Sequence, residues 1–335
     1  MTWRMPAEGD PHERTWLAWP TTGYTLGDDE GSAEAARHTW ASVANAVSEF
    51  EPVTVVVDPR DRELAPRYLS AAIDLLEAPL DDAWVRDSGP TFVLGDDGRL
   101  GAVDWVFNGW GAQDWASWER DAVLAPIIAE HAGAELVESA LTNEGGGIHV
   151  DGRGTVLLTA TVQLDPARNP GWSAADVEAE LARTIGATRA IWLPRGLTRD
   201  SERFGTRGHV DIVATMPEPG RVLVHTQRDP AHPDHAVSAE ATRILEHAGL
   251  EVLALPAPRA LRDDEGWVDW SYVNHSLVNG GVIAGVFDDA ADDEALDLMR
   301  AAYPGREVVG VDARELFARG GGVHCITQHQ PRAPA

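Results

Sequence analysis

Runs of apolar residues along the chain predict short strands that alternate with amphipathic helices. The segment 53–57 is rich in β-branched residues and ends at Asp58-Pro59, so we expect it to form a buried strand. Between Ser32 and Phe50, apolar side chains recur every three or four residues, which is the spacing of one helical face. The same spacing or a capping residue predicts further helices at 61–76, 119–131, from Ser173 onward, 238–248 and 290–302.

The predicted strands come in pairs that tight turns connect. Asp151-Gly152 and Asn279-Gly280 each lie between two apolar runs, as in β-hairpins. First strands of such pairs are expected at Trp84–Leu94, Gly147–Val150, His209–Met216 and Tyr272–Val278. Each pair is followed by a predicted helix and a further strand, so the order strand, strand, helix, strand repeats along the chain.

The last predicted strand, Val323–Gln328, has no partner strands after it, whereas the N-terminal segment has a strand, helix and strand to spare. We therefore expect one α/β domain over residues 1–335, built from five ββαβ modules. The fifth module would be closed jointly by the N- and C-terminal segments. A radial arrangement of such modules is a pseudo-symmetric, five-bladed α/β-propeller, which protects the edges of its sheets.

Two similar segments support an internal repeat. Glu144–Asp151 contains Gly-Gly-Gly-Ile-His, and Gly320–Gln328 contains Gly-Gly-Gly-Val-His. Glycines at the start of a strand let backbone or ligand come close, because they lack a Cβ. His149 and His324 occupy matching positions, and we expect both to stabilise their strands.

Composition narrows the class of protein. The 335 residues carry a net charge of −27 and include no lysine, which disfavours nucleic acid and anionic membranes as partners and favours small cations. The single cysteine excludes an internal disulfide and suits a reducing compartment. Neither a signal peptide nor an apolar run long enough to span a membrane is visible. We expect a cytoplasmic protein; a homo-oligomer is possible.

In a ring of modules, the polar residues that open each first strand would meet near the axis. They are Asp87, Glu144, His209, Asp211, Asn274, His275 and Cys325. Carboxylates can engage a planar guanidinium in a bidentate way and hold its carbon against a nucleophile. The thiol needs a neighbouring base or positive charge to become a thiolate. His209 would supply the base and Glu144 would hold its ring, while the bound cation would itself favour the thiolate.

Two alternatives from other classes follow from the same residues. The first is a zinc-dependent hydrolase with His209, Asp211, His324 and Cys325 as ligands. Against it, no ligand pair has a usual zinc spacing, and His324 and Cys325, adjacent on a strand, would point to opposite faces. The second alternative is a catalytically silent binding protein for cationic amines.

Seven segments resemble the agmatine deiminases, which belong to the guanidine-modifying superfamily with the pentein α/β-propeller fold. The resemblance covers nearly the whole chain, and its motifs occur in the family's order. The segments are Trp84–Phe92, 104–111, Glu144–Thr155, 168–170, 208–211, 271–274 and Gly320–Gln328 with Pro331.

The resemblance implies hydrolysis of a small guanidine, foremost agmatine to N-carbamoylputrescine and ammonia, through a thiouronium intermediate on Cys325. His209 would be the acid and base, Asp87 and Asp211 would hold the guanidinium, and Glu144 would orient His209. The substrate-binding residues would be Trp84 and Trp110, which line the substrate tail, with Asn274 and Gly320. No metal or organic cofactor is expected.

The chain departs from the family pattern at several positions near the matched motifs. Arg207 adds a cation just before Gly208-His209, Ile212 replaces an expected Asn, and His275-Ser276 replaces an aromatic pair. Agmatine carries a second positive charge, which an added arginine would repel. Deimination of another small guanidine, or transfer of its amidino group to an amine, is therefore an alternative within the enzyme class.

Overall fold

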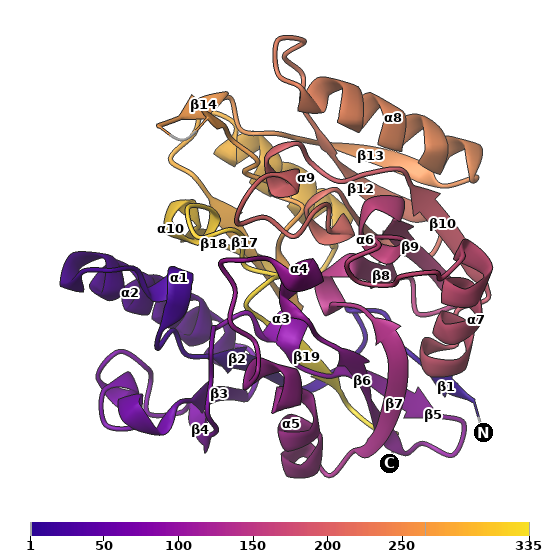
Figure 1. Cartoon of the computed structure of the whole chain (residues 1–335). Coiled ribbons are helices and arrows are strands. Elements are labelled where there is room, and N and C mark those ends of the chain that lie inside the picture. The colour runs from indigo at the N-terminus through magenta and orange to yellow at the C-terminus, as the bar shows by residue number, and fades with distance from the viewer. Residues whose placement is uncertain (1, 265, 335) are drawn as a thin grey trace.

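The computed structural model describes residues 2–264 and 266–334 and has a mixed α/β fold. Among these residues, five sheets have three or four strands each, and one small ladder has two. Figure 1 shows the long helices α2, α5, α7 and α8 at the periphery and the short α3 and α4 near the middle of the view.

One sheet contains strands from both ends of the chain, in the order β19-β2-β3-β4. The C-terminal β19 pairs antiparallel with β2, whereas β2 pairs parallel with β3 and β3 pairs parallel with β4. The helix α2 connects β2 to β3. The bounds are β2 His12–Ala18, α2 Glu30–Ser48, β3 Val53–Val57, β4 Asp74–Glu77 and β19 Gln328–Pro331.

The next sheet has the order β1-β5-β6-β7. Its hairpin β5–β6 is antiparallel, and α5 leads to β7, which is parallel to β6. The two-residue strand β1 adds to the edge at β5 and was not predicted. The bounds are β1 Trp3–Arg4, β5 Thr91–Gly95, β6 Leu100–Val106, α5 Leu124–Ala132 and β7 Glu135–Thr142.

The three remaining large sheets repeat this antiparallel pair, helix and parallel strand. The third has β8 Ile148–Val150, β9 Thr155–Thr159, α7 Ala174–Ile185 and β10 Arg189–Leu193. The fourth has β11 Ala214–Glu218, β12 Arg221–Thr226, α8 Asp234–His247 and β13 Glu251–Pro256. The fifth has β16 Ser276–Val278, β17 Gly281–Val286, α9 Asp292–Ala302 and β18 Glu307–Asp312.

Short elements fill the connections. The small ladder pairs β14 with β15. Four-residue helices occur as α1, α3, α4, α6 and α10. The bounds are β14 Arg262–Asp263, β15 Gly266–Trp267, α1 Gly23–Leu26, α3 Val85–Ser88, α4 Gly109–Ala112, α6 Ala160–Gln163 and α10 Arg314–Phe317.

Local sequence explains the helices that were predicted well. The helix α7 starts at a capping box in which Ser173 and Asp176 bond each other's backbone, and it ends at Gly186 in the left-handed conformation. Its buried face packs Val177 and Leu181 into the core. In α2, the N-cap Asp29 accepts a hydrogen bond from the backbone N–H at position 32.

The predicted helix at 61–76 is wrong. In its place the chain forms 3-10 turns at Pro59–Asp61 and Ala65–Arg67 and then the strand β4. Pro66 lacks a backbone N–H, and its ring clashes with the preceding turn of a helix, so a helix cannot run through this position.

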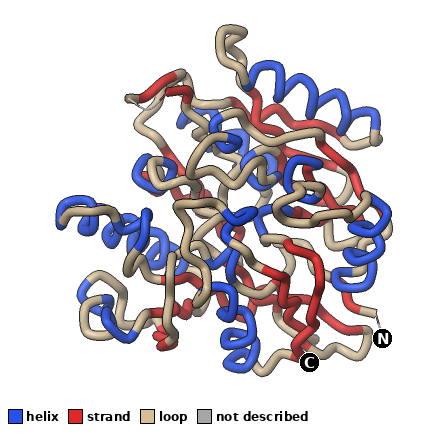
Figure 2. The backbone as a smooth tube through the Cα atoms, in the orientation of Figure 1, coloured by secondary structure: helices blue, strands red, loops and turns tan. Residues whose placement is uncertain are grey.

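The predicted first strands begin too early. At 84–94 the chain first makes the helix α3, and at 209–216 a 3-10 turn at Val210–Ile212 precedes β11. Residues 323–326 form a turn, in which Thr327 donates hydrogen bonds from its backbone N–H and its hydroxyl to the carbonyl of His324. Figure 2 shows loops and short helical turns over the middle of the view. The site residues therefore lie on turns ahead of the strands.

In the described part of the chain, no helix is both long enough and apolar enough to cross a bilayer.

Candidate active site

Cys325 lies in the turn at 323–326, and only 5% of it is exposed. Its Sγ lies 3.5 Å from Oδ2 of Asp211 and 3.2 Å from Nδ2 of Asn274. Gly321 makes this position possible, because a Cβ there would lie 3.1 Å from the sulfur and closer still to the ring of Trp84. The thiol is thus packed between a carboxylate and an amide donor.

His209 faces two carboxylates. Its Nε2 lies 3.2 Å from Oε2 of Glu144, and its Nδ1 lies 3.8 Å from Oδ1 of Asp87. This Nδ1 is buried and has no hydrogen-bond partner. Burial opposes a charge on the ring, but Asp87 and Glu144 outweigh it and raise the pKa of His209 to about 9. The imidazole is therefore protonated at neutral pH and keeps one nitrogen available.

Glu144 is fully buried and paired with Arg168. Nε of Arg168 lies 2.9 Å from Oε1 and 3.1 Å from Oε2 of the carboxylate. Burial would raise the pKa of Glu144, but Arg168 and then His209 lower it to about 2. Glu144 is therefore an anion held by an arginine on one side and by the imidazole on the other.

Asp87 is held by neutral donors. Oδ2 accepts from Nε1 of Trp110 at 2.9 Å, and Oδ1 accepts from the backbone N–H of Gly146 at 3.2 Å. Burial, opposed by the charge of His209, raises the pKa of Asp87 to about 6. A cation bound beside this carboxyl would favour its ionised form.

The second triglycine segment brings these groups to one point. A Cβ on Gly146 would lie 3.0 Å from Oδ2 of Asp211 and 3.0 Å from Oδ1 of Asp87, and closer still to Nδ1 of His209. Since a methyl group cannot fit there, the three functional groups surround the bare backbone of a glycine.

Burial, followed by the negative charges of Asp211 and Asp87, raises the pKa of the Cys325 thiol well above its ordinary value. The neighbouring carboxylates therefore disfavour the thiolate when no cation is bound beside it. A cation bound beside the sulfur would lower this pKa.

A small cavity lies beside the sulfur and is closed by aromatic rings. Its volume is about 10 Å³, room for about one water molecule. Trp110 stacks on Trp115 with ring centroids 5.3 Å apart, and Phe204 stacks on Tyr24 at 4.1 Å. The lining residues are Trp84, Asp87, Trp110, Trp115, Phe204, Gly205, Thr206, Arg319, Gly320 and Cys325.

All nine predicted site residues lie in this region. Trp84, Asp87, Trp110, Gly320 and Cys325 line the cavity itself. His209, Glu144, Asp211 and Asn274 lie behind its wall, where Asn274 contacts the sulfur and accepts from the backbone N–H of His324 at 2.9 Å.

Arg207 does not point a free charge into the cavity. Its Nη1 pairs with Oδ2 of Asp165 at 2.8 Å, and the same oxygen accepts from Nη1 of Arg168 at 3.0 Å. Asp165 thus neutralises the cation that sets this sequence apart from the family pattern.

Several residues that act on the site were not singled out from the sequence. Asp200 fixes the His209 loop, since its Oδ2 accepts from the backbone N–H groups of Gly208 and His209 at 2.6 and 3.1 Å. Arg168 contacts the predicted site residue Glu144, and Glu8 contacts His324, which in turn contacts Asp211. Asp200 and Glu8 lie outside the segments that resemble the family. Arg168 lies in the matched segment 168–170, but no role was predicted for it.

The prediction that the side chains of His324 and Cys325 point to opposite faces of a strand is wrong. Both contact the same oxygen of Asp211, His324 through Nδ1 at 2.8 Å and Cys325 through Sγ at 3.5 Å. Residues on a turn need not alternate as strand residues do.

The donor groups do not fit a metal ion well. Glu8, His149 and His324 are close enough together to surround one. However, each ring nitrogen of His324 faces a carboxylate oxygen, and Nε2 of His149 accepts from the backbone N–H of Met216 at 2.8 Å. A metal ligand must offer a lone pair that no proton or other donor occupies. His324, which the zinc alternative shares, therefore has no nitrogen to offer.

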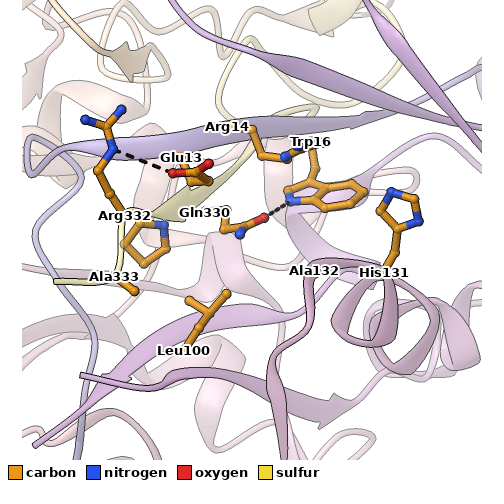
Figure 3. Close-up of a pocket in the computed structure, with 10 residues that line it drawn as sticks. Glu13, Arg14, Trp16, Leu100, His131, Ala132, Gln330, Arg332 and Ala333 are labelled. Carbon is orange, nitrogen blue, oxygen red and sulfur yellow. Dashed lines mark hydrogen bonds and ion pairs between the residues drawn. The ribbon is translucent and has the colours of Figure 1, made fainter. Parts of the chain in front are cut away.

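A separate cavity of about 400 Å³ lies between β2, β19 and α5 (Figure 3). Trp16 donates to Gln330 there at 3.1 Å, and Arg332 pairs with Glu13 at 3.6 Å. None of the predicted site residues lines this cavity.

Comparisons with known proteins show the family of the chain. Residues 4–331 match the family model described as Porphyromonas-type peptidyl-arginine deiminase. The chain is 56% identical over 339 residues to a protein of Streptomyces coelicolor, covering 99% of this chain and 100% of that protein. It is 39% identical over 362 residues to the agmatine deiminase of Stutzerimonas stutzeri, covering 98% of this chain and 95% of that protein.

A solved structure of a related protein has the same fold as this chain. The agmatine deiminase of Enterococcus faecalis superposes with a TM-score of 0.90 at 32% identity, covering 99% of this chain and 96% of that chain. The chain therefore belongs to the Porphyromonas-type peptidyl-arginine deiminase family, among whose relatives the agmatine deiminases match it over nearly their whole length.

Proposed function

We propose that this protein hydrolyses agmatine to N-carbamoylputrescine and ammonia. The relatives named agmatine deiminase cover nearly the whole chain. The single observation that carries the proposal is the convergence of a thiol, an imidazole and two carboxylates around Gly146 and the cavity beside Cys325. This set of groups suits a planar cation with an electrophilic carbon.

The guanidinium of the substrate would bind between Asp87 and Asp211. Oδ1 of Asp211 is buried and has no hydrogen-bond partner, so one acceptor is available to an N–H donor. The positive charge of the substrate then lowers the pKa of the Cys325 thiol, because it offsets the two carboxylates that raise it. Thiolate formation is thus coupled to substrate binding.

The first chemical step joins Cys325 Sγ to the guanidinium carbon. His209, protonated at neutral pH, donates a proton to the departing nitrogen, and the C–N bond breaks to release ammonia. The carbon remains on the sulfur as a thiouronium. Glu144, through its contact with Nε2, keeps the ring of His209 in place during this transfer.

The second step reverses the role of His209. The neutral imidazole accepts a proton from water, whose oxygen attacks the thiouronium carbon. The resulting tetrahedral adduct then collapses: the C–S bond breaks, the hydroxyl proton passes to the departing sulfur, and the ureido product leaves with the thiol restored. No step requires a metal ion or an organic cofactor.

The aromatic wall would hold the rest of the substrate. Trp84 and Trp110 line the cavity, and the face of an indole ring attracts a cation. The ion pair between Arg207 and Asp165 removes the objection that an added arginine repels the substrate's ammonium group. The small cavity implies that the segment around Phe204 moves outward when agmatine enters.

We further propose that residues 1–335 form one domain with the five-bladed pentein propeller fold. Five sheets with the repeated ββαβ order support this, as does the sheet that β19 and β2 close together. The cytoplasmic location and the lack of nucleic-acid partners remain predictions from the sequence, which cell fractionation and a binding assay can test.

A panel of small guanidines tests the substrate. Agmatine, arginine and butylguanidine are each assayed for ammonia and for ureido product, with the Cys325→Ala variant as the control. We expect both products from agmatine with the unaltered enzyme and neither from the variant. Turnover of another guanidine without turnover of agmatine would refute the substrate and keep the mechanism. Release of the parent amine, putrescine from agmatine, without ammonia or ureido product would indicate transfer of the amidino group to an acceptor amine.

A further inference from the structure

A buried series of charged groups leads away from the cavity behind Asp211. Nδ1 of His324 lies 2.8 Å from Oδ2 of Asp211, and its Nε2 lies 2.7 Å from Oε1 of Glu8. Nη1 of Arg86 lies 3.4 Å from the same oxygen of Glu8. All four residues are less than 9% exposed. Charges this deeply buried are costly unless they pair with one another.

The geometry favours the charged form of His324. An ionised carboxylate only accepts hydrogen bonds, so with Glu8 and Asp211 both ionised the two ring nitrogens donate and the ring is an imidazolium. Burial and Arg86 oppose this charge, but Glu8 and Asp211 outweigh them and raise the pKa of His324. Burial would raise the pKa of Asp211, but His324, followed by His209 and Arg86, outweighs it and lowers this pKa. The pair is thus ionised on both sides.

We propose that His324 is a positioning residue that holds Asp211 as an oriented anion for the substrate guanidinium, with Glu8 anchoring His324 from behind. The role rests on the proposed function, because it concerns the carboxylate that would bind the guanidinium. Oδ2 of Asp211 is turned towards His324 and Cys325, which leaves Oδ1 without a partner. His324 thereby selects which oxygen of Asp211 is available to the substrate.

The other copy of the repeat shows that this arrangement is not required by the fold. His149 occupies the position that matches His324, and it is equally buried. Its Nε2 accepts from the backbone N–H of Met216 at 2.8 Å and lies 3.1 Å from Oγ1 of Thr215. An imidazole that accepts from a backbone N–H is not an imidazolium. His149 therefore serves as the matched control.

The state of His324 can be measured directly by NMR on protein labelled with ¹⁵N in histidine, with its signals assigned by their loss in His324→Gln. We expect both ring nitrogens to be protonated at pH 7.5. In Glu8→Gln the pKa of His324 should fall, since one carboxylate is lost. The titratable and charged groups that interact with the ring are Glu8, Arg86, His149, Asp211, His275 and His329. A neutral ring at pH 7.5 in the unaltered protein would overturn the proposal.

A binding cycle tests the role itself. In a Cys325→Ala background, agmatine affinity is measured by calorimetry for Asp211→Asn, His324→Gln and the double variant. Each single change should weaken binding about tenfold to a hundredfold, the loss expected for one hydrogen bond to a charged group. The double variant should match Asp211→Asn within about twofold, because His324 acts only through Asp211. If the affinity loss of the double variant equals the product of the two single losses, the two residues act independently and the proposal is overturned.

Two further variants separate positioning from general destabilisation. His149→Gln alters the same buried cluster but removes contacts to Thr215 and Met216 and none to Asp211, so it should lower the melting temperature yet leave agmatine affinity within about twofold. If His324→Gln fails to fold, Glu8→Gln replaces it in the test. This variant keeps His324 in place and should still weaken agmatine binding. Equal loss of affinity in His149→Gln and His324→Gln would contradict the proposal. If agmatine is not the substrate, the guanidine identified by the panel replaces it in the cycle, and the NMR measurement still decides the protonation state.

Discussion

His209 Nε2 lies 3.2 Å from Glu144 Oε2, while the Nδ1 of the same ring is buried and has no partner. One nitrogen of the imidazole is therefore held by a permanent anion, and the other is available on the side of Asp87. This arrangement lets the imidazole of His209 donate a proton from Nδ1 and later accept one there without rotation of the ring.

Replacing Glu144 by Gln should shift the pH profile. The negative charge of Glu144 helps to raise the pKa of His209 to about 9, so its loss lowers that pKa. Because the first step requires protonated His209, the alkaline limb of kcat/KM should move to lower pH. The rate at pH 8 should fall about tenfold to a hundredfold. An unchanged alkaline limb, measured between pH 6 and pH 10, would show that Glu144 does not act through His209.

The same substitution leaves Arg168 without its anionic partner, so stability needs its own control. Asp165→Asn also removes a partner of Arg168 but leaves Glu144 and His209 intact. It should lower the melting temperature without moving the alkaline limb.

Alkylation of Cys325 should be slow in the free enzyme. Burial and two carboxylates raise the pKa of the thiol, and only the thiolate reacts with iodoacetamide. The rate of inactivation should rise steadily from pH 7 to pH 9. A plateau already at pH 7, measured as residual activity against time, would mean that the thiol ionises without substrate.

Gly146→Ala should abolish activity with little loss of folding. The added methyl group would press against His209, Asp87 and Asp211 at once. Their displacement should lower kcat/KM at least about a hundredfold, because positioning errors near 1 Å have effects of this size. Gly31→Ala, at the exposed start of α2, should leave kcat/KM unchanged. Near-normal activity of Gly146→Ala, with a circular dichroism spectrum like that of the unaltered protein, would show that the three groups do not converge as described.

Phe204→Ala should change substrate binding more than chemistry. The ring closes the cavity by stacking on Tyr24 at 4.1 Å, and its edge packs against Trp115. Removing it should raise KM for agmatine several-fold and leave kcat within about threefold, as expected when uniform binding is lost. A fall in kcat with unchanged KM, in steady-state assays, would contradict this view of the segment.

The sequence predicts which polar residues lie close together better than it predicts the elements that carry them. Cys325, His209 and Asp87 stand in polar segments that are unusual for plain strands, so the motifs were visible. The backbone conformation of these segments was not predictable. The helix α3 and the turn at 323–326 depend on hydrogen bonds that form within the folded chain. A mixture of apolar and polar residues there matches a strand equally well.

Longer-range contacts were outside the reach of local patterns. Glu8 precedes every predicted element, yet it meets His324 across 316 positions of the chain. Arg168 and Asp200 likewise support Glu144 and His209 from loops. By contrast, α7 was predictable because its capping box and its apolar spacing lie within one short segment.

The central claim is that Cys325 attacks the guanidinium carbon. Rapid acid quenching of the enzyme during turnover of agmatine, followed by peptide mass spectrometry, tests it most directly. The account predicts a modified peptide that contains Cys325 and is heavier by the mass of agmatine less ammonia. Steady turnover with Cys325 unmodified at every quench time, or an adduct on a different residue, would contradict the account.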